Sequence, residues 1–333
     1  MNSYKTPEGY NEHDYQKVVA FLEQTDDEGV PNGKKLSEEY DPSNPETWGT
    51  DYQGNQNFEW INIDGERRIQ SITVDGMNLC GTLDVSGCTA LKTLYCYNND
   101  LTELDVSGCT VLETLFCSSN DLSELDVSSC TALRDLSCDD NDLSELDVRG
   151  CISLEKLWCE YDNLTELDVS GCTALERLDC NGNNLTELDV SGCTALEHLE
   201  CDHNYLTELD VSGCTSLTYL YSDYNKLTEL DVSGCTALRE LYCDYNYLTE
   251  LDVSGCTALK TLYCNHNKLT NLDVSGCAAL EKLWCEYNDL TELDVSDCTK
   301  LRYLNGRNTY LTGIGVKGLP PKCQAVFRPV ARA

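Results

Sequence analysis

Cysteine carries the most reactive side chain in this sequence, and it recurs at a fixed interval. The chain contains 22 cysteines, and most of them belong to two series in which each step is 21 residues. The first series is Cys88, Cys109, Cys130, Cys151, Cys172, Cys193, Cys214, Cys235, Cys256, Cys277 and Cys298. The second is Cys96, Cys117, Cys138, Cys159, Cys180, Cys201, Cys243, Cys264 and Cys285, with Ser222 and Gly306 in the two remaining positions. Such thiols can form disulfides, bind metals, act as nucleophiles or pack as small hydrophobic groups.

These four roles make different demands on spacing and surroundings. Stacked repeats lie about 4.8 Å apart, which falls within the roughly 4.4–6.8 Å that a disulfide needs between Cα atoms. Identical residues in a parallel ladder point the same way, however, so Cys80 and Cys323 near the ends are the better disulfide candidates. The sequence contains no CxxC pair of the kind that binds a metal, which argues against metal clusters. Inward thiols also lack the electropositive setting that a nucleophile needs. We therefore expect buried thiols, with disulfides as the main alternative.

The repeat that contains the cysteines reads LxxLxCxxNxLxxLDVSxC, as in residues 259–277. Alternation along a strand would turn Leu262 and Cys264 inward and Thr261, Tyr263 and Asn265 outward. One unit of 21 residues has too small a core to fold alone, whereas stacked units bury a continuous apolar column. The short strands of successive units would then pair in parallel.

This pattern, over about residues 69–316, resembles the leucine-rich repeat. It is most similar to the nested 21-residue bacterial class called IRREKO, because both halves of the unit carry the motif. The resemblance implies an α/β solenoid with short parallel strands, about 11 rungs and little helix outside the N-terminal cap. It also implies export by bacteria of oxygen-poor habitats, where 22 unpaired thiols would be less of a hazard.

A further column holds asparagine where each unit must turn. We expect its side-chain amide to bond backbone groups that the turn leaves free, which a leucine could not do. The column consists of Asn99, Asn120, Asn141, Asn183, Asn204, Asn225, Asn246, Asn267 and Asn288. Asp162 and Thr309 depart from it, and local strain or a substitute water is expected there.

The ends differ from the repeats and divide the chain into three predicted parts. Residues 1–58 form an N-terminal helix-and-loop cap, in which the apolar spacing of residues 13–24 predicts a helix. Residues 59–310 form the solenoid, beginning with an atypical first rung. Residues 311–333 form the C-terminal cap, where Pro320 and Pro321 cannot continue a ladder.

The outward positions vary from unit to unit, unlike the framework around them. One column reads Tyr95, Phe116, Ser137, Trp158, Asp179, Glu200, Tyr221, Tyr242, Tyr263, Trp284 and Asn305. Another contains Tyr161, His203, Tyr224, Tyr245, His266 and Tyr287, and acidic residues that include Asp223, Asp244 and Glu286 lie between the two. Aromatic rings edged with carboxylates suit a protein partner or the apolar face of a sugar. The alternative is that the rings only stack on one another and stiffen the sheet.

The opposite face repeats Glu-x-Asp, from Glu103 with Asp105 to Glu292 with Asp294. A solvated acidic face that prevents aggregation is the simpler interpretation, and weak calcium binding is the sharper one. His198, Glu200 and Asp202 alternate along one strand and could hold a transition metal. Variation within the aromatic strip explains these three residues more simply, and we expect no other cofactor.

Charge and missing motifs narrow the function further. Lys and Arg total 23 against 58 Asp and Glu, a formal charge of −35 that repels nucleic acid and anionic lipid and favours positively charged partners. No apolar run could span a membrane, and the first residues lack a secretory signal, so an exported form would have lost one. No catalytic motif is present. We predict an extracellular or cell-surface binding module that is not an enzyme, with a structural spacer or consensus-like scaffold as the alternative.

Overall fold

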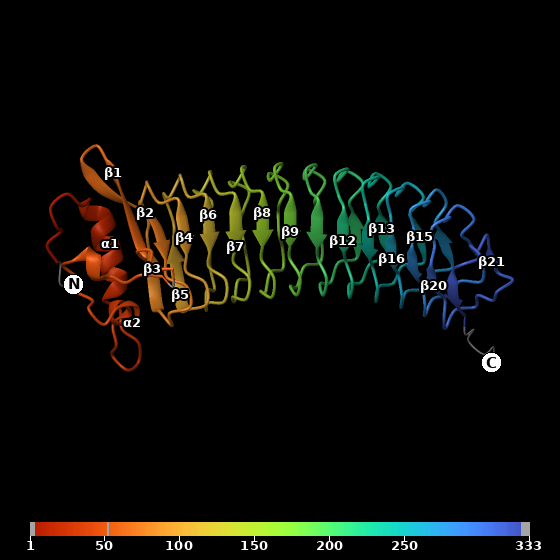
Figure 1. The fold of residues 1–333 in the computed structure, drawn as a ribbon, viewed down its shortest axis with the longest axis horizontal. Helices are drawn as coiled ribbons and strands as arrows, with labels where there is room; N and C mark the ends of the chain where they lie inside the picture. The colour runs from red at the N-terminus through yellow and green to blue at the C-terminus, as the bar shows by residue number, and fades with distance from the viewer. Residues whose placement is uncertain (1–3, 52, 328–333) are drawn as a thin grey trace. The chain divides into compact units, whose positions relative to one another are not determined.

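The computed structural model describes residues 4–51 and 53–327. The fold is a parallel-strand β-solenoid of about 12 turns with little helix, as the sequence predicts (Figure 1). The chain divides into two compact units, Met1–Leu167 and Asp168–Ala333, which are called the first and second units below.

Helices lie at the beginning of the first unit. The predicted helix is α1, Glu12–Leu22, and it begins where the Asn11 side chain accepts the Asp14 backbone N–H. A short helix α2, Asn32–Leu36, and a 3-10 turn at Pro45–Thr47 follow. The core of this cap is aromatic, because the buried Trp48 ring lies 5.4 Å from the Tyr15 ring.

The first unit contains two sheets. The larger has the order β1 (Phe58–Ile63), β2 (Glu66–Thr73), β4 (Thr93–Tyr95), β6 (Thr114–Phe116), β7 (Asp135–Ser137) and β8 (Lys156–Trp158). Strands β1 and β2 form an antiparallel hairpin, which the repeat pattern does not predict, and every later pairing is parallel. The smaller sheet pairs β3 (Cys80–Asp84) with β5 (Asp100–Asp105).

The second unit continues the same plan. Its larger sheet has the order β9 (Arg177–Asp179), β10 (His198–Glu200), β12 (Tyr219–Tyr221), β14 (Glu240–Tyr242), β16 (Thr261–Tyr263), β18 (Lys282–Trp284), β20 (Tyr303–Asn305) and β22 (Gln324–Val326). Three short pairs lie on the other side of the turns: β11 (Glu208–Asp210) with β13 (Glu229–Asp231), β15 (Glu250–Asp252) with β17 (Asn271–Asp273), and β19 (Leu293–Asp294) with β21 (Val316–Lys317).

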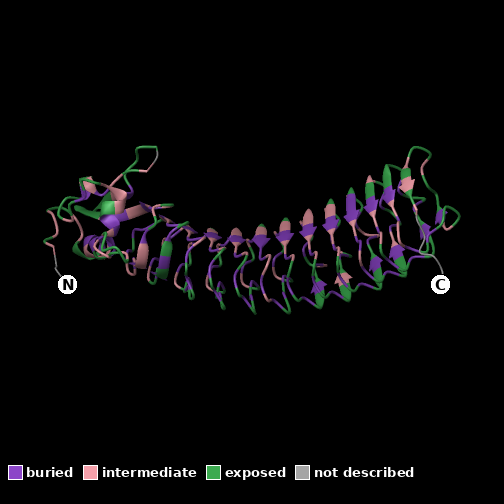
Figure 2. Cartoon of the chain, turned by 90° about the horizontal axis from the view of Figure 1, so that it is seen from below, coloured by how far each residue is buried: buried purple, intermediate pink, exposed green. Residues whose placement is uncertain are grey.

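Equivalent residues of successive repeats lie side by side. Leu241 pairs with Leu262 and Tyr242 pairs with Tyr263, a register of 21 residues. Nearly all leucines and cysteines of this framework are buried, with Leu230 half-buried. Figure 2 shows that buried residues recur in the strands of successive turns. Thr261 and Asn265, predicted to face outward, are also buried, because the repeats on both sides pack against them.

The asparagine column performs its predicted task. The Asn246 Oδ1 atom accepts the Leu227 N–H at 2.9 Å, and its Nδ2 donates to the carbonyl oxygens of Ser222 at 2.9 Å and Cys243 at 3.3 Å. An asparagine such as Asn246 therefore satisfies backbone groups of its own repeat and of the repeat before it. Thr309, one of the two departures, donates its hydroxyl to the Gly306 carbonyl at 2.7 Å.

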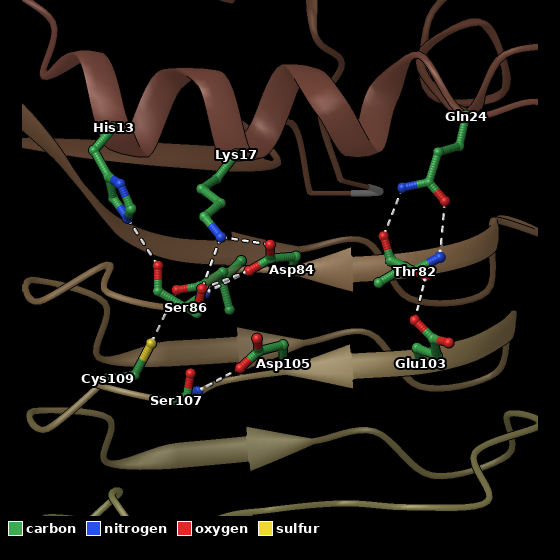
Figure 3. Close-up of polar contacts among 11 residues, drawn as sticks. His13, Lys17, Gln24, Thr82, Asp84, Ser86, Glu103, Asp105, Ser107 and Cys109 are labelled. Atoms are coloured by element: carbon green, nitrogen blue, oxygen red, sulfur yellow. Dashed lines mark hydrogen bonds and ion pairs between the residues drawn. The ribbon is translucent and has the colours of Figure 1, made fainter. Parts of the chain in front are cut away.

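Side chains of the cap close the outer edge of the β3 strand (Figure 3). Gln24 donates to the Thr82 carbonyl at 2.6 Å and accepts the Thr82 N–H at 2.7 Å, so its amide replaces a neighbouring strand. Lys17 forms an ion pair with Asp84 and donates to the Ser86 hydroxyl at 2.7 Å. An edge that is covered in this way cannot pair with another chain.

The end of the chain adds a strand that the sequence reading did not predict. Pro320 and Pro321 lie between β21 and β22, and β22 then pairs in parallel with β20. The prolines therefore interrupt the ladder without ending it. None of the helices in the described residues is long and apolar enough to cross a membrane.

Candidate recognition surface

The first aromatic column differs between the two units. In the second unit the rings of Tyr242, Tyr263 and Trp284 stack almost in parallel, with centroids 4.6 and 4.3 Å apart and interplanar angles of 15° and 6°. Tyr221 begins this stack at 4.8 Å from Tyr242, tilted by 46°. The four rings are half-buried. Stacking covers both faces of Tyr242 and Tyr263, whereas Tyr221 and Trp284 at the ends of the stack each meet one ring of the column.

In the first unit the same column is less regular. Tyr95 and Phe116 lie 5.1 Å apart at 45°, and Phe116 meets Trp158 edge to face at 6.2 Å, because Ser137 separates them by one repeat. The three rings therefore do not form a parallel stack.

The second aromatic column lies on the turn after the strands. Its residues all have positive φ values, for example 55° at Tyr224 and 56° at Tyr245, a backbone conformation that residues other than glycine rarely adopt. Five rings of this column form a continuous stack with centroids 4.1–4.5 Å apart: His203, Tyr224, Tyr245, His266 and Tyr287. Tyr224, Tyr245 and Tyr287 are 42–47% exposed. Tyr161, in the first unit, occupies the same column and is 61% exposed.

Carboxylates form a hydrogen-bonded ladder between the two columns. Asp202 Oδ1 accepts the Asp223 N–H at 2.6 Å, Asp223 Oδ1 accepts the Asp244 N–H at 2.6 Å, and Asp244 accepts the Asn265 N–H at 2.6 Å. Burial raises the pKa of Asp202 to about 6 and that of Asp223 to about 8, where the charges of Asp202 and Asp244 add to the effect. Burial also raises the pKa of Asp244. Glu286 continues the ladder by donating its N–H to Asn265 Oδ1 at 3.0 Å.

The proposed transition-metal residues each have a different partner. His198 stacks on Tyr219 at 4.5 Å, Glu200 accepts a hydrogen bond from the Arg177 guanidinium at 2.7 Å, and Asp202 belongs to the ladder just described. The structure therefore does not gather these three side chains around one point.

In the described residues, one group of three potential ligands does gather within 4.8 Å: His13, Asp14 and Cys88. Asp14 is already bound by the Arg68 guanidinium at 2.7 and 3.0 Å and by the Ile69 N–H at 3.0 Å. Burial raises the pKa of the Cys88 thiol, which disfavours the thiolate that a metal requires. The group is better explained by the packing of the cap.

The Glu-x-Asp face has a local structural role. Each aspartate accepts the backbone N–H two residues later, as Asp105 does from Ser107 at 2.9 Å and Asp231 from Ser233 at 2.9 Å. Hydrogen bonds from the hydroxyl and backbone N–H groups of the serine two residues later lower the pKa of several members, among them Asp126 and Asp189. In register, Glu208 lies beside Glu229 and Asp210 beside Asp231, which keeps like charges adjacent. The turn explains why aspartate recurs, whereas the glutamates of this face are exposed and take no part in the turn.

All 22 cysteines have free thiols in this structure, and the two series are buried. In the first series Cys235 donates to the Val211 carbonyl at 3.2 Å, and in the second Cys243 donates to the Tyr263 carbonyl at 3.3 Å. Ser222, which replaces a cysteine, donates to the Tyr242 carbonyl at 3.1 Å in the same way. The thiols thus combine apolar packing with weak hydrogen bonds to the backbone.

Two exposed rings outside the predicted strip also have cationic neighbours. The Lys226 ammonium lies 4.4 Å from the Tyr205 ring centroid, and that of Lys268 lies 4.7 Å from Tyr247. The sequence contains a signal for these pairs, since each tyrosine follows a turn asparagine and a lysine stands one repeat later.

Comparison with known proteins places this geometry in a family. A model described as "Leucine Rich repeats (2 copies)" matches residues 173–213 and 236–277. The functional domain of InlJ from Listeria monocytogenes, which includes a cysteine ladder, is 32% identical over 73% of this chain and 69% of that chain, with a TM-score of 0.50. The chain therefore belongs to the leucine-rich repeat family. Such domains typically mediate protein binding.

More distant structures share the fold alone. The internalin InlF from Listeria monocytogenes is 21% identical over 70% of this chain and 82% of that chain, with a TM-score of 0.51. The ectodomain of the receptor kinase GASSHO1/SCHENGEN3 from Arabidopsis thaliana, solved with CASPARIAN STRIP INTEGRITY FACTOR 2, is 20% identical over 73% of this chain and 36% of that chain, with a TM-score of 0.54. A comparison with curated proteins found no match.

Proposed function

We propose that this protein is a non-enzymatic binding module that recognises a protein surface through the double aromatic column of the second unit. The observation that carries this proposal is the parallel run of two ring stacks on one side of the repeats, with a carboxylate ladder between them. Ring edges and tyrosine hydroxyls together provide apolar contact area and hydrogen-bonding groups, the combination that protein interfaces favour.

The stacking geometry favours a protein over a glycan. A sugar ring packs its apolar face against the face of an aromatic ring, but Tyr263 has Trp284 on one face at 4.3 Å and Tyr242 on the other at 4.6 Å. Only the edges of such a ring remain for a ligand. The formal charge of −35 would also accelerate encounter with a positively charged partner.

Stacking that only stiffens the sheet is the alternative, and it would make the protein a spacer. The second column argues for more than stiffening, because its rings occupy positions with positive φ. Asn98 and Asn308 occupy the same column with φ values of 57° and 51°, and asparagine tolerates this conformation better than tyrosine does. Tyrosines kept in this conformation are more simply explained by recognition.

A pull-down from cell-surface extracts tests the proposal. Tyr242→Ala and Trp284→Ala remove rings of the first column, and Tyr245→Asn removes a ring of the second without creating backbone strain. We expect each to weaken capture of the partner. The matched controls are Tyr205→Ala and Tyr247→Ala, which remove rings of similar exposure from another column. Equal capture by all variants, or no partner at all, would favour the spacer. If the native protein binds a glycan on an array and the ring variants do not, the proposal would be redirected to sugars.

We also propose a bacterial origin within the nested 21-residue class and a location outside the cell or at its surface. The repeat length and the similarity to the Listeria InlJ domain support the first point. Buried thiols support the second, because a core protected from oxidants suits an exported protein. Protease treatment of intact cells of the source organism should remove the protein, and full protection would place it inside.

A further inference from the structure

A cavity of about 380 Å³ lies in the first unit, where the cap meets the beginning of the first aromatic column. Its lining includes three aromatic side chains and three carboxylates: Tyr95, Tyr97, Phe116, Asp51, Glu59 and Asp75. These residues come from the loop before β1, from β1 itself, from the end of β2 and from the repeats that begin at β4 and β6. The arrangement is thus created by tertiary packing of the cap against the solenoid.

Tyr95 begins its aromatic column, and only one face of its ring meets another ring of the column. On one side it meets Phe116 at 5.1 Å and 45°. On the other side its register partner on β2 is Thr73, which also lines the cavity, and among the described residues no second ring stacks on Tyr95 there. By contrast, Tyr263 is covered on both faces. The face of an aromatic ring carries the negative part of its quadrupole and attracts cations.

The carboxylates around this ring reinforce the attraction. Glu59 is exposed at the cavity and Asp75 is half-buried. The Asn55 side-chain amide donates to Asp51 at 3.0 Å, and together with backbone N–H groups this bond lowers the pKa of Asp51, which keeps it ionised. None of the described residues that line the cavity is a lysine, arginine or histidine. Nothing in that lining neutralises the negative charge.

We propose that this cavity binds an alkylammonium group, with the cation over the Tyr95 ring and its charge balanced by Glu59 and Asp75. Two sources share this chemistry, the side chain of a lysine on a partner protein and a free quaternary ammonium compound. A lysine ammonium donates hydrogen bonds to the carboxylates, whereas a quaternary ammonium relies on ring faces alone. The site shares Tyr95 and Phe116 with the predicted strip, but it does not require the stacked rings of the second unit.

Titration of the full chain with small probes tests the site without any protein partner. The probes are Nα-acetyl-lysine methylamide, tetramethylammonium and the neutral Nα-acetyl-norleucine methylamide. Binding is measured by the NMR chemical shifts of the Tyr95 ring and the nearby backbone. We expect saturable binding of the lysine probe with a Kd on the order of 1–10 mM and no saturation by the neutral probe. Tighter binding of tetramethylammonium than of the lysine probe would identify a quaternary ammonium as the ligand.

Variants separate the ring from the charge. Tyr95→Leu keeps apolar bulk but removes the ring, and Glu59→Gln keeps the shape but removes the charge. Each should weaken binding of the cation about three- to tenfold. The matched controls, Tyr263→Leu and Glu124→Gln, should leave it unchanged. Equal binding of the neutral probe, absence of saturation, or unchanged affinity in folded Tyr95→Leu protein would overturn the proposal, and none of these results would affect a partner captured through the second unit.

Discussion

Asp162 Oδ1 accepts the backbone N–H of Leu143 at 3.2 Å, in the position where most repeats place an asparagine. Its second oxygen, Oδ2, is buried and has no hydrogen-bond partner. In the preceding repeat, Asn141 uses the equivalent nitrogen to donate to the carbonyl oxygens of Cys117 at 3.2 Å and Cys138 at 2.8 Å. A protonated Asp162 could donate in the same way, but a carboxylate could not.

The pKa of Asp162 follows from this position. Burial is the main reason why the pKa of Asp162 is raised to about 7, and the charges of Asp139 and Asp140 raise it further. The native protein therefore keeps a proton between pH 3.8 and about 7 that the unfolded chain has lost. The contribution of this group to stability falls as pH rises through that window and stays low above it.

Asp162→Asn should therefore stabilise the protein at high pH. We expect the free energy of unfolding at pH 8 to rise by roughly 1–3 kcal/mol, because the amide removes a buried charge and supplies a hydrogen-bond donor that the carboxylate lacks. The gain should shrink towards pH 4, where Asp162 is protonated. Guanidinium unfolding at the two pH values measures the difference. Asp140→Asn, which removes the same charge from an exposed position, should have little effect, and an equal gain in both variants would point to general charge repulsion.

Thiol labelling of the native protein should be slow and incomplete. Cys80 and Cys323 are half-buried, whereas the other cysteines are buried and burial raises the pKa of Cys285, for example, to about 12. Ellman's reagent should modify these two thiols first and all 22 after denaturation. A shortfall in the denatured count that reductant restores would reveal disulfides.

Gln24→Ala should weaken the N-terminal end of the solenoid. The substitution leaves the Thr82 N–H and carbonyl groups without partners at the edge of β3, a cost of about 1–2 kcal/mol in local stability. Hydrogen exchange should accelerate at Thr82 while the second unit keeps its protection. Glu39→Ala, at an exposed position of the cap, provides the control. Unchanged exchange at Thr82 would mean that water replaces the glutamine without loss.

Calcium at millimolar concentration should raise the melting temperature slightly at constant ionic strength. The glutamate ladder places Glu208 beside Glu229, and a divalent cation would relieve their repulsion. Glu229→Gln should reduce the shift, whereas Glu59→Gln, away from this ladder, should not. A melting temperature that calcium leaves unmoved would mean that the face serves only for solubility.

The repeat made much of this architecture predictable. A strict period of 21 residues specifies which residues become neighbours, so the buried leucine and cysteine columns and the asparagine ladder follow from the sequence. The same reasoning did not predict that Asn265 is buried, because outward alternation on one strand does not reveal that neighbouring repeats cover the residue. It also gave no sign of the β1–β2 hairpin, which lies outside the repeat.

The candidate sites were less accessible to sequence reasoning. The aromatic columns could be listed, but whether Tyr263 presents a face or an edge depends on its χ angles and on the rings of adjacent repeats. The cavity beside Tyr95 depends on where the cap loop folds back, which no periodic pattern encodes. The raised pKa of Asp223 likewise comes from packing and from like charges one repeat away.

The polar ladders connect each repeat only to its immediate neighbours: Leu227 bonds to Asn246, and Asp244 bonds to Asp223. A repeat removed or added as a whole therefore leaves the same set of bonds at the new junction. Gene duplication or unequal recombination in steps of 21 residues can change the length of the protein without a new core. The reach of its binding surface can thus evolve separately from its stability.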